Sequence, residues 1–178
     1  MRSFVFAAAL IFAGAAQAET PQDLLASLAG QWEGALGYRD YQSNELFELA
    51  VVTSIRTAED GRTLVRTSRF DEGDAPDVFI VSVSGFDDSS GLYETAGFRA
   101  GRAMAVTRES IVAQTVQGPE HWTLLFSERG MDDDREADIR VTLTRTGDET
   151  LSVKEVDYLD DPAVRFEFRN QTRLRRVQ

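Results

Sequence analysis

After Gly30, apolar and polar residues alternate in short runs that are separated by turn-forming residues. This pattern indicates β-strands joined by hairpins. Consecutive hairpins favour a meander, and closing such a sheet removes its exposed edges. The sequence therefore predicts an all-β, antiparallel up-and-down barrel of about ten strands. The runs are Trp32–Tyr41, Leu46–Thr57, Thr63–Phe70, Asp77–Phe86, Leu92–Phe98, Arg102–Thr107, Ile111–Val116, Trp122–Glu128, Ala137–Thr146, Thr150–Tyr158 and Val164–Leu174.

A short helix is expected before the first strand, over residues 20–30. Thr20 suits the N-cap, and Pro21 suits the first helical position. Gly30 suits a left-handed C-terminal position. A helix this short needs tertiary packing, so we expect its leucines to cover one end of the barrel.

The alternation also assigns faces to the strands. Ile139, Val141 and Leu143 share one face. In the last strand Val164, Phe166 and Phe168 are expected to point inward and to form an apolar row. The same inward row continues with the polar residues Asn170 and Thr172.

Residues 78–81 (Val-Phe-Ile-Val) are apolar on both faces of their strand. The outer face is either covered by the N-terminal helix or part of an interaction patch. Of the two interpretations, coverage by the helix is favoured.

Residues 1–18 have the features of a secretory signal peptide. A single Arg2 precedes the apolar run Phe4–Ala13, and Ala16-Gln17-Ala18 is an A-x-A cleavage site. We expect cleavage after Ala18, a periplasmic or secreted location, and residues 19–178 as a single barrel domain without stable membrane insertion.

The composition narrows the function classes. No cysteine is present, which excludes thiol catalysis and thiolate metal sites. The formal net charge of −11 argues against nucleic acid as a partner. The sequence gives no indication of oligomeric state.

The segment Leu28-Ala29-Gly30-Gln31-Trp32-Glu33-Gly34, followed by Tyr38-Arg39-Asp40-Tyr41, resembles the opening of lipocalins and other calycin barrels. It is similar to uncharacterised, exported bacterial lipocalin-like domains. The resemblance implies that Trp32 plugs the closed end of the barrel. It also implies that an Arg near the end of the last strand packs across Trp32, with Arg173, Arg175 and Arg176 as candidates.

Lipocalins usually carry small apolar molecules, so the resemblance implies a cup with that use. The related nitrobindin-like barrels hold haem through a His near the C-terminus. Here Val164–Leu174 contains no His, and the only His is His121. We therefore expect no haem and no other cofactor.

Catalytic and metal-binding patterns are weak. His121 follows a Gly-Pro turn and is interpreted as a solvated residue at a strand start; no G-x-S-x-G motif accompanies it. A metal site made of several imidazoles is excluded. The acidic runs Asp132-Asp133-Asp134, Asp71–Asp74 and Asp157–Asp161 are interpreted as solvated turns rather than Ca²⁺ loops.

If Trp32 points inward, Tyr38 and Asp40 share its face, with Asp40 at the open rim. Arg66 and Arg99 are further candidates for the interior. A charged residue inside a barrel needs a partner or a ligand, and an internal brace is the favoured alternative to ligand recognition. The ligand-binding candidates are Tyr38, Asp40, Arg66, Arg99, Phe166 and Phe168.

The sequence thus predicts an exported barrel that holds a small, partly apolar molecule in its lumen. The alternative is a structural or interaction protein of the envelope without a small ligand. An enzyme is the least favoured class, because no nucleophile motif is present.

Overall fold

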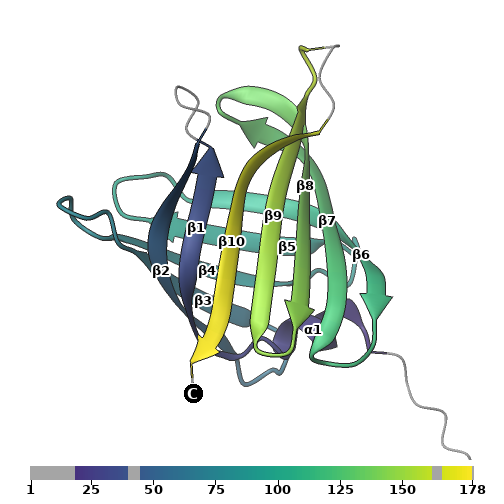
Figure 1. The fold of residues 1–178 in the computed structure, drawn as a ribbon. Helices are drawn as coiled ribbons and strands as arrows, with labels where there is room; N and C mark the ends of the chain where they lie inside the picture. Colours follow the sequence, from purple (N-terminus) through teal and green to yellow (C-terminus); the bar gives the residue numbers. More distant parts are fainter. Residues whose placement is uncertain (1–18, 40–44, 162–165, 178) are drawn as a thin grey trace, which may run out of the picture.

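The computed structural model describes residues 19–39, 45–161 and 166–177. Helix α1 (Pro21–Ala26) precedes ten antiparallel strands that close into a barrel (Figure 1). Every strand pairs with its neighbours in sequence, and β1 pairs with β10 to complete the wall. The predicted fold is confirmed. The strands are β1 (Gly30–Arg39), β2 (Leu46–Thr57), β3 (Leu64–Phe70), β4 (Val78–Phe86), β5 (Tyr93–Arg99), β6 (Ala105–Val116), β7 (His121–Asp132), β8 (Arg135–Thr146), β9 (Glu149–Tyr158) and β10 (Glu167–Val177).

Strand β6 corrects one prediction, because residues 105–107 of the predicted run Arg102–Thr107 and the whole run Ile111–Val116 belong to one continuous strand, which begins at Ala105. The break was suggested by the polar residues 108–110, which face the two sides of the barrel wall in alternation. Arg108 forms an ion pair with Glu94, and Glu109 lines the interior. A polar residue can therefore continue a strand here, because the lumen accepts polar side chains.

Helix α1 covers one end of the barrel (Figure 1). A capping box between Thr20 and Asp23 starts the helix, and Leu24 and Leu25 are buried. The Gln22 and Ser27 side chains donate hydrogen bonds to carbonyls of Arg62 and Pro119, in turns at this end. The helix thus forms the floor of the barrel.

Gly30 has a different role from the one predicted. The helix ends at Ala26, and Gly30 begins β1 with φ +147°. A Cβ atom on Gly30 would lie 2.6 Å from the Arg176 guanidinium. The glycine therefore permits the close approach of Arg176 rather than a left-handed helix end. At Gly34, a Cβ would lie 2.0 Å from the carbonyl oxygen of Arg173, so a glycine is needed there too.

The outer face of β4 is not covered by α1, contrary to the favoured interpretation. Phe79, Val81 and Val83 are exposed on this face. Val81 pairs with the exposed Phe98, and Val83 is joined through Ala96 to the exposed Val106. We call these five exposed residues the outer apolar face.

Candidate functional site

The barrel encloses a cavity of about 210 Å³ between α1 and the middle of the wall. Each of the ten strands contributes at least one lining residue. The apolar part of the lining gathers at the floor and on the β7, β8 and β10 side. It consists of Leu25, Leu28, Trp32, Ile55, Leu64, Phe126, Val141, Leu143 and Leu174.

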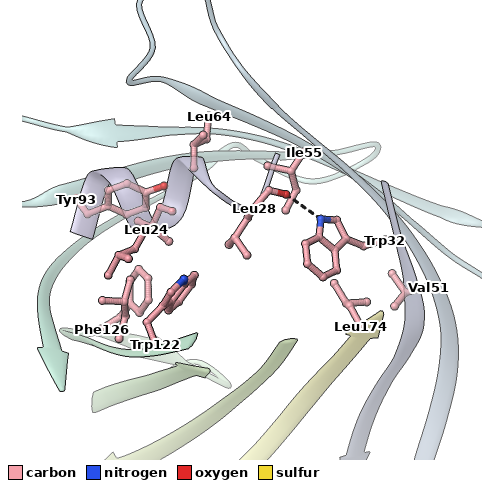
Figure 2. Packing of buried hydrophobic residues seen from close by; sticks show 12 residues of the cluster. Leu24, Leu28, Trp32, Val51, Ile55, Leu64, Tyr93, Trp122, Phe126 and Leu174 are labelled. Atoms are coloured by element: carbon pink, nitrogen blue, oxygen red, sulfur yellow. Dashed lines mark hydrogen bonds between the residues drawn. The ribbon is translucent and has the colours of Figure 1, made fainter. Parts of the chain in front are cut away.

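Trp32 closes the floor of this cavity. It is 1% exposed, and its indole N–H donates a hydrogen bond of 2.8 Å to the Leu28 carbonyl, shown as a dashed line in Figure 2. Figure 2 shows the indole between Leu28 and Leu174, with Leu24, Trp122 and Phe126 farther along the same cluster. Trp32 thus lies at the end of the barrel that α1 covers, and the role of barrel plug that the resemblance implied for it stays a prediction.

Arg176 is the arginine that packs across Trp32, with its guanidinium carbon 4.6 Å from the ring centroid. The guanidinium donates hydrogen bonds to the carbonyls of Ala29 and Ser27, at 2.8 and 3.0 Å. Leu174 faces inward and Arg176 follows it by simple alternation, so no bulge is required for this contact.

Arg145 is a second floor arginine, which sequence reasoning missed. Its side chain is 3% exposed, and it donates to the carbonyls of Ser27, Pro119 and Gly147. The signal was present, because the inward row Ile139, Val141 and Leu143 continues to Arg145 by alternation.

The polar part of the cavity is centred on Arg66, from β3. The remaining polar lining residues are mostly hydroxyl side chains, namely Ser82, Ser84, Tyr93, Thr95, Thr150, Ser152 and Thr172, together with Glu109. Enclosure by the wall lowers the pKa of Arg66, and the nearby Tyr93 opposes this effect. The side chain is still accessible to solvent inside the lumen.

Within residues 19–39, 45–161 and 166–177, Arg66 forms no ion pair and donates no hydrogen bond. Its electrostatic neighbour is Tyr93, whose pKa is raised by burial and which interacts with the Ser84 hydroxyl. Arg66 is therefore a cation inside the lumen that no carboxylate of the described chain neutralises.

A second space, of about 220 Å³, lies beyond Arg66 on the side away from α1. Arg66, Ser82 and Thr172 line both spaces. The Thr53 and Ser68 hydroxyls, which also line this space, hydrogen-bond each other at 2.8 Å. Arg66 thus stands between a lower, largely apolar space and an upper one.

Glu109 on β6 is the cavity's acidic group. Burial raises its pKa to about 7, and repulsion from Glu128 adds to the shift, while Lys154 and a Thr107 hydrogen bond oppose it. Burial also raises the pKa of Glu128. Near neutral pH, Glu109 can therefore either donate or accept a proton.

Asp132 forms a compact ionic brace farther up the lumen. Its carboxylate is 2.7 Å from Lys154 Nζ and 2.7 Å from Arg169 Nε, and it accepts a 2.9 Å hydrogen bond from the Tyr158 hydroxyl. Asp132 is buried, so its assignment to a solvated turn was wrong. The turn consists of Asp133 and Asp134 alone, and both have positive φ.

The other sequence-predicted residues do not gather around Arg66. Tyr38 is at the end of β1 away from the floor, 37% exposed, with its ring 5.3 Å from that of Phe47. Arg99 lies at the end of β5, opposite Ile80 in register. Neither lines the two spaces. Asp40 lies outside the described residues.

Phe166 and Phe168 do not line the lumen, which corrects the expected inward row. The β10–β9 register shifts between Phe168 and Asn170, so Phe168 pairs with Glu155. The Arg39 guanidinium lies 5.9 Å from the Phe168 ring centroid, and that of Arg140 lies 3.5 Å from the Phe166 ring centroid. Strict alternation failed because a bulge inserts Arg169.

His121 is exposed at the start of β7, as predicted. Among the described residues, no group of three His, Cys, Asp or Glu side chains could hold a metal ion. In the same ranges, no helix has the length and apolar character needed to cross a membrane.

Known proteins resemble this chain in fold only. No protein-family profile and no curated protein matches it. The crystal structure of Rv2717c from M. tuberculosis is similar with a TM-score of 0.62 and 16% identity, over 89% of this chain and 99% of that one. A DUF3598-family protein of unknown function from Nostoc punctiforme has a TM-score of 0.28 and 8% identity, over 90% of this chain and 100% of its own, a similarity too distant to show a common fold. The chain therefore shares its fold with Rv2717c, whose printed name gives no ligand or activity.

Proposed function

We propose that the protein binds a small, partly apolar molecule in the lumen of its barrel. The observation that carries the proposal is the cavity of about 210 Å³, with an apolar floor and, in its wall, Arg66, which no carboxylate of the described residues neutralises. A barrel that served only as a scaffold would gain stability from filling this space with side chains. Mixed lining of this kind is typical of small-molecule sites.

We further propose that the protein acts outside the cytoplasm after removal of residues 1–18. This rests on the A-x-A pattern at Ala16-Gln17-Ala18, which lies outside the described residues. Amino-terminal sequencing of protein from the periplasmic fraction tests it, and a mature chain that begins at Glu19 is expected.

Blocking the cavity tests the binding function. Ser82 lines both spaces, whereas its neighbour Val83 is exposed on the outside of the same strand. Ser82→Trp is expected to weaken the binding of an environment-sensitive apolar dye by at least about tenfold, whereas Val83→Trp should leave dye binding unchanged. Melting curves identify any variant that fails to fold. Equal dye binding by folded Ser82→Trp and wild type contradicts the proposal.

The outer apolar face supports a second candidate function, that of an envelope interaction protein. Phe79, at 54% exposed, and Phe98, at 49%, lie among three exposed valines on this face. Contiguous patches of this kind are uncommon on monomers without a partner. Cross-linking in the periplasm distinguishes the candidates: a monomer without cross-linked partners contradicts this second function and leaves the lumen proposal intact.

A further inference from the structure

We propose that the ligand is an organic anion, a monocarboxylate whose carboxylate binds Arg66 and whose apolar part extends toward Trp32 on the floor. This inference rests on the proposed lumen-binding function and specifies its ligand class. It follows from the contrast between Arg66 and the other arginines inside the barrel.

The other cations of the interior have partners. Arg145 and Arg176 are satisfied by backbone carbonyls of the floor. Lys154 and Arg169 share the Asp132 carboxylate. These partners hold the four side chains in place, so their role is structural, in the wall and floor of the barrel.

Arg66 has no such partner within the described ranges, although it lines the cavity and its side chain is open to solvent in the lumen. The surrounding wall partly desolvates its charge, which lowers the pKa of Arg66 and makes the charged form less favourable than on the outer surface. An anion in the lumen would relieve this cost, and the guanidinium presents a planar fork of donors suited to a carboxylate. Ser82, Ser84 and Tyr93 line the same cavity and add hydroxyl groups around the proposed carboxylate.

The space between Arg66 and the floor limits the apolar part. Its volume is about 210 Å³, and its lining toward the floor includes Leu28, Trp32 and Leu174. A protein cavity of about 150 Å³ holds one benzene molecule. The lower space therefore fits an apolar part of about six to ten carbon atoms.

The test compares three probes of equal chain length and different charge: octanoate, 1-octanol and octylamine. Binding to the full mature chain is measured by calorimetry and by intrinsic tryptophan fluorescence, to which both Trp32, which lines the cavity, and Trp122 contribute. Octanoate is expected to bind at least about tenfold more tightly than octanol, as a charge-assisted hydrogen-bonded pair implies, and octylamine more weakly than either. Equal affinities of octanoate and octanol would overturn the inference but leave lumen binding intact.

Variants then assign the preference to Arg66. Arg66→Gln should weaken octanoate binding by about tenfold or more, with little change for octanol. The matched control is Arg69→Gln, on the same strand but ion-paired with Asp77 on the exposed surface. Undiminished octanoate binding by Arg66→Gln would overturn the inference.

If neither octanoate nor octanol binds, and Ser82→Trp does not change dye binding, the lumen-binding function itself is contradicted. If Arg66→Gln does not fold, the octanoate-to-octanol ratio of the wild-type protein still decides the question.

Discussion

The arginines inside the barrel have two different roles, which their partners distinguish. Arg145 and Arg176 join α1 and the first strand to the rest of the wall through backbone carbonyls. Arg66 has no such bonds among the described residues and faces open space. The same residue type thus serves stability at the floor and, in our proposal, recognition in the lumen.

Removal of the Arg176 guanidinium should destabilise the protein. Arg176→Met leaves the Ala29 carbonyl without its side-chain donor, leaves Arg145 as the side-chain donor to the Ser27 carbonyl, and removes the contact over Trp32. We expect a loss of about 2–3 kcal/mol in the free energy of unfolding, measured by urea denaturation. Arg175→Met, at an exposed neighbouring position, should change it by less than about 0.5 kcal/mol. Equal effects of the two substitutions would show that the floor bonds contribute nothing specific.

Glu109 should make stability depend on pH. Its pKa is about 7 in the folded protein, above the ordinary value of 4.5. The folded state therefore binds more protons than the unfolded state between these values, and stability falls as pH rises from about 4.5 to about 7. The expected contribution is about 3 kcal/mol at most. Glu128, Lys154 and Tyr93 are the charged or titratable groups that act on the site.

Urea denaturation at pH 5 and pH 8 measures this contribution as the difference between wild type and Glu109→Gln. The difference should shift in favour of the variant as pH rises, whereas Glu136→Gln, on the exposed surface, should follow wild type. A pH-independent difference between Glu109→Gln and wild type would show that Glu109 has the same pKa in both states.

Alternation alone predicted part of the site at the level of single residues. Trp32 lies at the floor and Arg66 faces the lumen, in the positions that alternation along their strands suggested. Arg145 and Arg176 also face inward, each two residues beyond an inward-facing leucine of the same strand. Phe166 and Phe168 could not be placed, because the bulge at Arg169 moves the residues that precede it in the strand to the opposite face of the wall. The pairing of Asp132 with cations from β9 and β10 depends on contacts distant in sequence.

At the scale of elements, the helix and hairpins followed local rules, whereas β6 did not. The Thr20–Asp23 capping box and the positions of Leu24, Leu25 and Leu28 were readable from spacing. The continuity of β6 was not, because Arg108-Glu109-Ser110 has the composition of a turn. Only a wall with polar groups on both sides makes those residues compatible with a strand.

The packing of α1 on the barrel should depend on Leu24, which is 0% exposed. Leu24→Ala removes its contacts in the floor cluster and is expected to cost about 2–5 kcal/mol in the free energy of unfolding. Leu159→Ala is the matched control at 44% exposure, with an expected cost below about 0.5 kcal/mol. A small cost at Leu24 would mean that the floor helix is not firmly seated.

A substitution in the β7–β8 turn should increase the stability of the protein, because the turn residues Asp133 and Asp134 have φ of 52° and 58°. Asn-Gly suits two consecutive left-handed positions better than Asp-Asp. The double substitution Asp133→Asn with Asp134→Gly should therefore raise the unfolding free energy by about 0.5–1 kcal/mol, measured by urea denaturation. A decrease would contradict the turn conformation. Asp74→Gly, in an exposed loop, serves as the control for added glycine.

At the scale of the whole molecule, the barrel separates two surfaces that a ligand or partner could use. The lumen has a floor of apolar residues and, within the part of the chain that the structure describes, Arg66 without a counter-charge, whereas the outer apolar face has exposed Phe79, Phe98 and three valines. The sequence predicted closure into a barrel, since hairpin spacing is local. It left open whether the interior is filled, because cavity volume depends on how all ten strands pack together.

The most direct test of lumen binding is a crystal structure of the protein soaked with 8-bromooctanoate, in which anomalous scattering locates the bromine. Our account predicts bromine inside the barrel near Trp32 and Leu28, with the carboxylate at Arg66. Bromine found only against Phe79, Val81 and Phe98 on the outside, with no ligand in the lumen, would contradict it.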